Sequence, residues 1–184
     1  MLRPLSAHGF DALASPGSDP SDENDALAAY AIDSDPNTAW HTQYYLRDPV
    51  FGGLKKGTGL ILDMGSRVRL SSVTLSLGPA SGADVAIEIG NDDTLAAVTL
   101  RTFHTTARAN DIGWTYTFKT ARQAEGRYVL IWFTKLPAVG PGRFEAQIFN
   151  IIIRGWRPDR CPAGRSMKDY ACADRSLSTV PRRT

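Results

Sequence analysis

Oxygen-bearing side chains are concentrated between residues 31 and 40, in the run AIDSDPNTAW. This run contains the carboxylates of Asp33 and Asp35, the hydroxyl of Thr38 and an Asp-Pro pair, and it ends on Trp40. A calcium ion takes six to eight oxygen ligands from carboxylates, carbonyls and hydroxyls. Asp, Asn, Ser and Pro are also the commonest turn-forming residues. The run therefore predicts either a plain turn or a hard-cation site, and its local chemistry favours the turn.

A second set of side chains that could bind a ligand combines aromatic rings with polar groups beside turn-forming residues. Tyrosine and tryptophan present a flat apolar face with a polar edge, which suits sugar rings and protein anchors. The same aromatic side chains could instead cover the open end of a small β-sandwich, which is the favoured alternative. The candidate ligand-binding residues are His41, Tyr44, Tyr45, Arg47 and Trp114.

Residue types for catalysis are sparse in this sequence. The histidines are His8, His41 and His104, and none lies in a Gly-x-Ser-x-Gly setting or pairs with a second histidine at metal-ligand spacing. Carboxylates are plentiful, but a glycosidase pair needs a deep cleft, which a single small β-sandwich rarely has. We therefore expect a protein without catalytic activity.

Cys161 and Cys172 are the two cysteines of the chain, and both lie near its C-terminal end. A bridge across this short loop would stabilise the fold by about 2–4 kcal/mol and would imply an oxidising compartment. A metal site is less favoured, because no histidine lies near either cysteine. The sequence favours a disulfide, and two free thiols are the alternative.

Size and charge narrow the class of protein. The chain has 184 residues and 42% hydrophobic content, which suits one domain with a substantial core. No stretch approaches the roughly 18 consecutive apolar residues of a membrane span, so we expect no membrane insertion by this segment. Eight basic and three acidic residues lie from Arg154 onward, against thirteen basic and sixteen acidic residues before it. The body has no basic stripe, so nucleic acid is not expected as a partner.

The elements that must position these residues are predicted to be strands. Runs rich in β-branched and aromatic residues alternate with Gly, Pro and Asn turns, which predicts an all-β sandwich or barrel. Residues 1–30 are expected to form a loop segment with a helical turn near residues 25–30, and residues 156–184 a basic tail outside the sandwich. The predicted strands cover residues 59–63, 68–77, 84–89, 95–103, 114–118, 128–133 and 147–153.

Five short motifs follow one another in a fixed order along the chain. They are AxDxDxxTxW at 31–40, GLILDMG at 59–65, VTL at 73–75, RYVLI at 127–131 and IxIxG at 151–155. This ordered set resembles the discoidin domain, also called the F5/8 type C or galactose-binding-like family. The resemblance implies a jelly-roll β-sandwich of about eight antiparallel strands over residues 31–155.

Two longer stretches narrow the resemblance. FGGLK at 51–55 and RYVLIWFTKLP at 127–137 are similar to the extracytoplasmic C-terminal domain of actinobacterial MviN-type lipid II flippases and membrane kinases. The resemblance implies a non-catalytic, extracytoplasmic binding module of a larger membrane protein. Its expected partner is cell-envelope carbohydrate or a protein, bound through loops at one end of the sandwich. The alternative is a structural or regulatory protein-interaction domain with a vestigial sugar site.

The resemblance also implies a structural calcium ion at the opening motif. Asp33 would provide a carboxylate, Asp35 a carboxylate or carbonyl, and Thr38 a hydroxyl and carbonyl. The fourth family ligand is usually a glutamate, and Asn150 stands at that position. A neutral amide supplies one oxygen and no charge, so calcium affinity is expected to be weak. Trp40 is expected to be a core residue beneath the loop.

Overall fold

The computed structural model describes residues 1–11, 23–91, 102–121 and 124–158. No helix among these residues has the length and apolar character needed to span a membrane. The described residues form eleven strands and two short 3₁₀ helices, in the order β1 (Ser6–Phe10), η1 (Asp25–Ala31), β2 (Trp40–His41), β3 (Tyr45–Leu46), η2 (Phe51–Gly53), β4 (Thr58–Leu77), β5 (Ala83–Gly90), β6 (Phe103–Ile112), β7 (Thr115–Lys119), β8 (Glu125–Lys135), β9 (Ala138–Gly140), β10 (Arg143–Phe144) and β11 (Gln147–Trp156).

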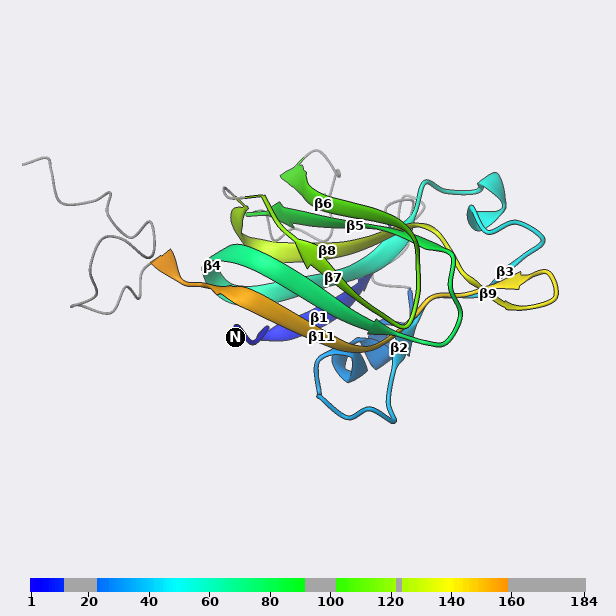
Figure 1. The fold of residues 1–184 in the computed structure, drawn as a ribbon, viewed down its shortest axis with the longest axis horizontal. Helices are drawn as coiled ribbons and strands as arrows, with labels where there is room; N and C mark the ends of the chain where they lie inside the picture. The colour runs from blue at the N-terminus through cyan, green and yellow to red at the C-terminus, as the bar shows by residue number, and fades with distance from the viewer. Residues whose placement is uncertain (12–22, 92–101, 122–123, 159–184) are drawn as a thin grey trace, which may run out of the picture.

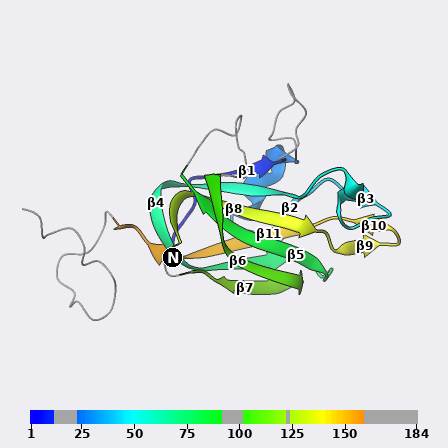
Figure 2. The same cartoon turned by 90° about the horizontal axis from the view of Figure 1, so that it is seen from above.

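The long strand β4 joins the two layers of the sandwich (Figure 1, Figure 2). Its first half pairs with β1 and β8, and β8 continues to β5 and β6. Its second half pairs with β11 and β7, and β11 continues to β2. The strand bends at Gly65, whose φ of 73° lies in the left-handed region that glycine tolerates best. All these pairings are antiparallel, which confirms the predicted all-β class.

The main core lies between the two layers. Alternate residues of β4, among them Leu60, Leu62, Val73 and Leu75, are fully buried, as expected when one face of a strand packs on a partner layer. Trp40 is also fully buried, and its indole nitrogen donates to the carbonyl of Glu23 at 2.8 Å. The prediction of Trp40 as a core residue is therefore confirmed.

A second apolar cluster uses the alternate side chains of β4 and β8. Strand β8 is buried along both faces, so residues 128–133 form an unbroken apolar run instead of an alternating one. The side chains that point away from the main core form a cluster of their own: Phe10, Ile61, Ala86, Phe103, Tyr128, Leu130 and Trp132.

The N-terminal segment differs from its prediction as a loop. Within residues 1–30 the structure has the strand β1, which pairs with residues 59–63 of β4, so the sandwich starts well before residue 31. The helical turn predicted near residues 25–30 is confirmed as η1. The run SAHGF is short and contains two polar residues and a glycine, so its own pattern gave no strand signal.

Two further strand predictions need correction. The runs predicted at 59–63 and 68–77 form the single strand β4, because the chain bends at Gly65 without ending the strand. Strand β6 was not predicted, since its inward residues Ala107 and Ala109 are small and carry little strand preference. The strand predicted at 95–103 falls almost wholly outside the described residues, as do Cys161, Cys172 and nearly all of the basic tail.

Candidate functional site

One end of the sandwich gathers the loops that carry the predicted ligand residues. There the small sheet β3-β10-β9 projects beyond the main layers (Figure 1, Figure 2). Strand β2 pairs with the start of β11, which places His41 opposite Gln147. The buried Thr42 reinforces this pairing, because its amide donates to Ala146 O at 3.0 Å and its hydroxyl accepts from Ala146 N at 3.1 Å. The chain around residue 42 is thereby fixed beside residues 145–147.

A cluster of polar side chains lies at this junction. One carboxylate oxygen of Glu145 is 3.0 Å from His41 Nδ1, and the other is 3.3 Å from a guanidinium nitrogen of Arg143. The Arg143 guanidinium stacks on Tyr44, with Cζ 4.5 Å from the ring centroid. Glu145 is largely buried, whereas Tyr44 is 55% exposed. A fixed carboxylate therefore lies beneath exposed hydrogen-bond donors and an aromatic ring.

The surroundings of His41 determine which ring nitrogen carries its proton. The Glu145 carboxylate and the carbonyl of Thr42 both lie 3.0 Å from Nδ1, and both can only accept a hydrogen bond. Asn24 Nδ2 also lies 3.3 Å from this nitrogen, but its shorter hydrogen bond, at 2.8 Å, is donated to the His41 carbonyl. We therefore assign the proton to Nδ1. Among the described residues Nε2 has no hydrogen-bond partner, so it can contact a ligand.

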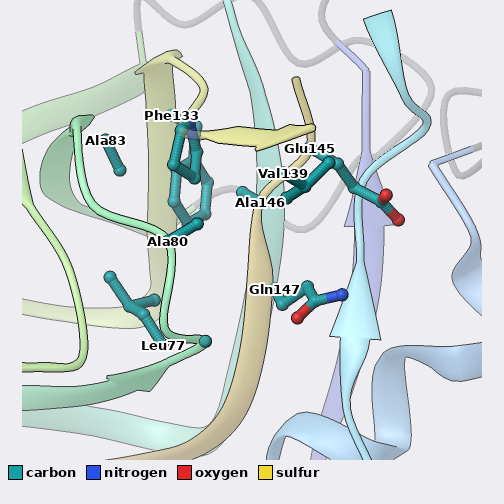
Figure 3. Close-up of a pocket in the computed structure, with 10 residues that line it drawn as sticks. Leu77, Ala80, Ala83, Phe133, Val139, Glu145, Ala146 and Gln147 are labelled. Atoms are coloured by element: carbon teal, nitrogen blue, oxygen red, sulfur yellow. The ribbon is translucent and has the colours of Figure 1, made fainter. Parts of the chain in front are cut away.

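A small cavity adjoins this cluster on the side of β11. Its volume of about 10 Å³ is room for about one water molecule, so it does not enclose a substrate. Glu145 and Gln147 line it together with Val139 on β9 and Leu77 at the end of β4. Figure 3 shows the carboxylate of Glu145 directed away from Leu77 and Phe133, whereas the side-chain oxygen of Gln147 lies close to Gly78. The site is thus an open surface and not a deep cleft.

Trp114 reaches the same end from a different part of the sequence. It occupies the turn between β6 and β7 with a φ of 52° and is 68% exposed. Its amide donates to Gly78 O at 3.3 Å, and its carbonyl accepts from Leu77 N at 2.5 Å. Gly78 in turn lies close to the side-chain amide of Gln147. The structure therefore places Trp114 near the rim of the cavity.

Tyr45 faces inward, unlike its neighbour Tyr44. Its hydroxyl donates to Glu23 at 3.2 Å, and its ring packs edge-on against Phe51 with centroids 5.1 Å apart. Burial raises the pKa of the Tyr45 hydroxyl above its usual value. Phe51 is fully buried. The capping interpretation therefore describes Tyr45 and Phe51, while Tyr44 and Trp114 remain available to a ligand.

Arg47 is held at the tip of the projecting sheet. Its amide donates to Gly142 O at 2.8 Å, and its φ of 71° is in the left-handed region. Its side chain is exposed and hydrogen-bonds no other described residue. Arg47 thus lies close in register to Arg143, which pairs with Leu46.

A buried ion cluster supports the ligand-carrying segment from below. Lys55 Nζ lies 2.8 Å from an Asp11 carboxylate oxygen and also contacts Glu23. The second carboxylate oxygen of Glu23 accepts from Gln43 N at 2.9 Å. Burial alone would lower the pKa of Lys55, but its hydrogen bonds to the two carboxylates raise the pKa overall. Glu23 therefore connects the loop that carries Lys55 to Gln43 and Tyr45, on either side of Tyr44.

The sequence predicted three ligand-binding residues that the structure places at this end of the sandwich: His41, Tyr44 and Trp114. It gave no such prediction for Arg143 or Glu145. These two lie about a hundred residues from His41 and meet it only through the β2-β11 pairing. Their one sequence signal is the RFE triplet directly after Pro141-Gly142, where a turn precedes the last strand.

The predicted calcium loop is closed by its own hydrogen bonds. Asp33 accepts from Asp35 N through one oxygen and from the Thr38 hydroxyl through the other, both at 2.8 Å. One oxygen of Asp35 accepts twice from Asn37 at 2.9 Å. These bonds describe the plain turn, and a cation would have to displace the Thr38 hydroxyl from Asp33.

Asn150 lies apart from this loop in the hydrogen-bond network. It is on β11, paired with Ser76, and no hydrogen bond between described residues joins it to Asp33, Asp35 or Thr38. No group of three or more acidic, histidine or cysteine side chains suited to a metal occurs among the described residues. The donor set therefore fits calcium poorly as it stands, and the calcium site stays a prediction.

No protein-family model and no curated protein sequence matches this chain. Several solved structures, in contrast, match its fold. The CBM32 of AlyQ in complex with 4,5-unsaturated mannuronic acid has a TM-score of 0.57 at 12% identity, over 83% of this chain and 96% of that one. Chitosan-binding module 1 of a chitosanase/glucanase from Paenibacillus sp. IK-5 has a TM-score of 0.56 at 15% identity, over 84% and 96%.

A third match is the family 32 carbohydrate-binding module of NanJ from Clostridium perfringens in complex with galactose. Its TM-score is 0.50 at 18% identity, over 80% of this chain and 91% of that one. At such low identities the likeness establishes the fold alone. The fold of this chain is a jelly-roll β-sandwich like that of these carbohydrate-binding modules, as the sequence predicted.

Proposed function

We propose that this domain is a non-catalytic carbohydrate-binding module whose ligand site is the open cluster of His41, Tyr44, Arg143 and Glu145. The observation that carries this proposal is a largely buried carboxylate that lies 3.0 Å from a histidine nitrogen and is hydrogen-bonded to an arginine, beneath exposed aromatic side chains. The structural neighbours named as sugar complexes add support, because they share this fold.

The cluster matches the two kinds of surface that a sugar presents. Hydroxyl groups donate and accept hydrogen bonds, whereas the C–H faces of the ring are apolar. Glu145 can accept from hydroxyls, and the partly exposed side chains of Arg143 and His41 lie beside it. Hydrogen bonds to charged groups are the stronger ones, so this trio would dominate affinity. Tyr44 and Trp114 would contact the apolar ring faces.

The open shape of the site favours recognition of a chain end or a side branch over hydrolysis. An enclosed cleft would be needed to exclude water and orient a glycosidic bond between two carboxylates. The cavity beside Glu145 holds about one water molecule. Binding at an exposed rim leaves the sugar solvated on one side, which suits a module that anchors a larger protein.

The biological setting is part of the proposal. We place the domain outside the cytoplasmic membrane, tethered by a parent membrane protein and directed at cell-envelope polymers such as peptidoglycan. The stretches at 51–55 and 127–137 support this setting through their resemblance to flippase- and kinase-linked domains. A disulfide between Cys161 and Cys172 would be consistent with an oxidising compartment.

Titration with sugars tests the proposal directly. Galactose, chitosan oligomers and solubilised peptidoglycan fragments would be titrated into the wild-type chain and the Tyr44→Ala variant by calorimetry. Tyr30→Ala is the matched control, because Tyr30 is also an exposed tyrosine but lies on η1. We expect at least one sugar to bind and Tyr44→Ala alone to weaken it. Absence of binding across the panel, or equal affinities for all three proteins, would contradict the proposal.

A further inference from the structure

A shallow hollow of about 460 Å³ lies between the N-terminal segment, the bend of β4 and the end of β11. In Figures 1 and 2 these segments lie at the end of the sandwich opposite β3 and β9, which mark the candidate sugar site. Three segments that are distant in sequence line it: residues 3–5 before β1, the bend of β4 at residues 64–66, and Arg157 after β11. The amide of Leu2 donates to Ile153 O at 2.8 Å, which holds the first and third segments together. The hollow is therefore formed by the fold and not by one local turn.

Two arginines without carboxylate partners flank this hollow. Arg157 Nη1 donates to Met64 O at 2.9 Å and also to the Ser66 hydroxyl, which fixes the guanidinium at the edge. Its other nitrogens have no hydrogen-bond partner among the described residues. Arg3 is exposed, and no described carboxylate pairs with Arg3 or Arg157. Both guanidinium groups can therefore meet an anion.

The acidic side chains near the hollow are already neutralised. Asp63 accepts two hydrogen bonds from Arg127, at 2.9 and 2.8 Å, and these hold the pKa of its carboxyl below the usual range. Glu125 is 2.7 Å from Arg69 and 3.3 Å from Arg67. The single negative charge of Glu125 balances only one of these two arginines, so the group of three side chains keeps a net charge of about +1. The end as a whole is cationic.

Apolar side chains complete the lining of the hollow. Leu5 is 73% exposed, and Pro4 and Met64 lie beside it. A cationic edge next to an exposed leucine matches the interface of an anionic bilayer, where phosphate groups lie above hydrocarbon. Guanidinium groups suit phosphate because their planar donors can bind two oxygens at once. A free anion would make no favourable contact with these apolar side chains.

We propose that this end of the domain docks on a membrane surface containing anionic phospholipids, with a lipid phosphate between Arg3 and Arg157 and Leu5 in the interfacial region. The candidate sugar site would then face away from the membrane. This docking rests on contacts separate from the proposed sugar site, so the two proposals succeed or fail independently.

Vesicle co-sedimentation tests the docking with the full chain. The probes are vesicles of phosphatidylcholine alone and vesicles in which phosphatidylglycerol replaces part of it. We expect binding to the second kind only, weakening as salt rises. Arg3→Ala should reduce partitioning about fivefold, the effect of one basic residue near an anionic surface. Arg3 makes no hydrogen bond among described residues, so this substitution should not disturb folding.

The matched control is Arg108→Ala, which removes the same charge from β6, where Arg108 donates to Thr105 at 3.1 Å. The basic residues beyond 158 also attract anionic vesicles, and this comparison separates their general attraction from docking at the hollow. Equal losses for Arg3→Ala and Arg108→Ala would overturn the proposal. Leu5→Ser gives an uncharged second test, because it should weaken partitioning without changing the net charge.

Soluble probes distinguish lipid docking from other anion binding. Inorganic phosphate and glycerophosphate should compete with vesicles only weakly, since they lack the hydrocarbon that Leu5 contacts. Saturable binding of inorganic phosphate without vesicle binding would overturn the proposal. Retention on heparin without vesicle binding would assign the surface to an acidic polymer and would overturn it too.

Discussion

Two charged clusters of this molecule each combine a buried carboxylate, a cation and a tyrosine ring, but they differ in how far the cation is buried. In the closed cluster, Glu23 and Lys55 have side chains 2% and 6% exposed. In the open cluster, Glu145 is 10% exposed while Arg143 is 51% exposed. Each cluster pairs a carboxylate with a cation and places that cation near a tyrosine ring.

The two clusters differ in how many of their hydrogen-bonding groups already have a partner within the protein. Both side-chain oxygens of Glu23 are occupied, by Lys55 and Tyr45 on one and by Gln43 N on the other. In the open cluster, the side chains of His41 and Arg143 are 39% and 51% exposed, and His41 Nε2 has no hydrogen-bond partner among the described residues. A fully satisfied buried cluster fixes the backbone, whereas a partly satisfied exposed cluster can exchange water for a ligand. Burial therefore separates the supporting cluster from the candidate binding site.

The largest expected effect comes from breaking the closed cluster. Lys55→Met leaves the Glu23 carboxylate buried without its cation, which should cost about 3–5 kcal/mol of unfolding free energy. Urea denaturation would show a lower midpoint. Lys135→Ala is the control, because Lys135 pairs with Asp111 at the surface and its removal should leave the midpoint nearly unchanged. Similar midpoints for both variants would show that the cluster does not stabilise the fold.

The next effect is on ligand binding and not on stability. Glu145→Gln keeps the shape of the side chain but removes the charge that pairs with His41 and Arg143. Loss of charged hydrogen bonds to the sugar should weaken binding about tenfold to a hundredfold. Glu125→Gln makes the same chemical change at the other end of the sandwich and should leave calorimetric affinity unaltered. Equal affinities for these two variants would remove Glu145 from the site.

The partly exposed pair of Asp63 and Arg127 should give a smaller, pH-dependent effect. Hydrogen bonds from Arg127 lower the pKa of Asp63 in the folded state below its unfolded value of about 4. The pair therefore stabilises the fold above about pH 4 and loses this contribution as the pH falls through the folded pKa. We expect about 1 kcal/mol after allowing for solvent screening. In Asp63→Asn the urea midpoint should change less between about pH 5 and pH 2 than it does in the wild-type chain. The same pH dependence in both proteins would refute this.

The smallest effect is expected at the exposed Asp33 loop. Calcium must compete there with the hydrogen bonds that Asp33 accepts from Asp35 N and Thr38. Binding to the native state alone stabilises by RT ln(1 + [L]/Kd), less than about 1 kcal/mol when calcium is near its Kd. We expect a modest rise of Tm in millimolar calcium that Asp33→Ala abolishes. An unchanged Tm for the wild-type chain would leave the loop as a plain turn.

The strands that could be predicted from sequence are those rich in β-branched and aromatic residues of their own. In β5, β8 and β11 these residues signal burial directly, whether they alternate with other residues or, as in β8, form an unbroken run. By contrast, β1 and β6 are held by neighbours: β1 by its ladder to β4, and β6 through its pairing with β5. Their short or small-residue sequences carry little information about such distant partners.

The candidate site was predictable to a similar degree. Turn residues around Tyr44 and Trp114 correctly indicated the end of the sandwich that carries the candidate site. No local pattern could separate Tyr44 from Tyr45, because the inward direction of Tyr45 depends on Glu23 and Phe51. Sequence reasoning therefore identified the loops but not which of their side chains face a ligand.

The central claim is that the open cluster binds sugar while the closed cluster only supports it. Amide chemical shifts of the labelled chain, recorded during titration with the sugar that binds in calorimetry, test this most directly. We expect shifts concentrated at His41, Tyr44, Trp114 and residues 143–147, and much weaker binding by the same shifts in Glu145→Gln. Saturable shifts confined to another surface, such as the hollow around Arg3 and Arg157, would contradict it.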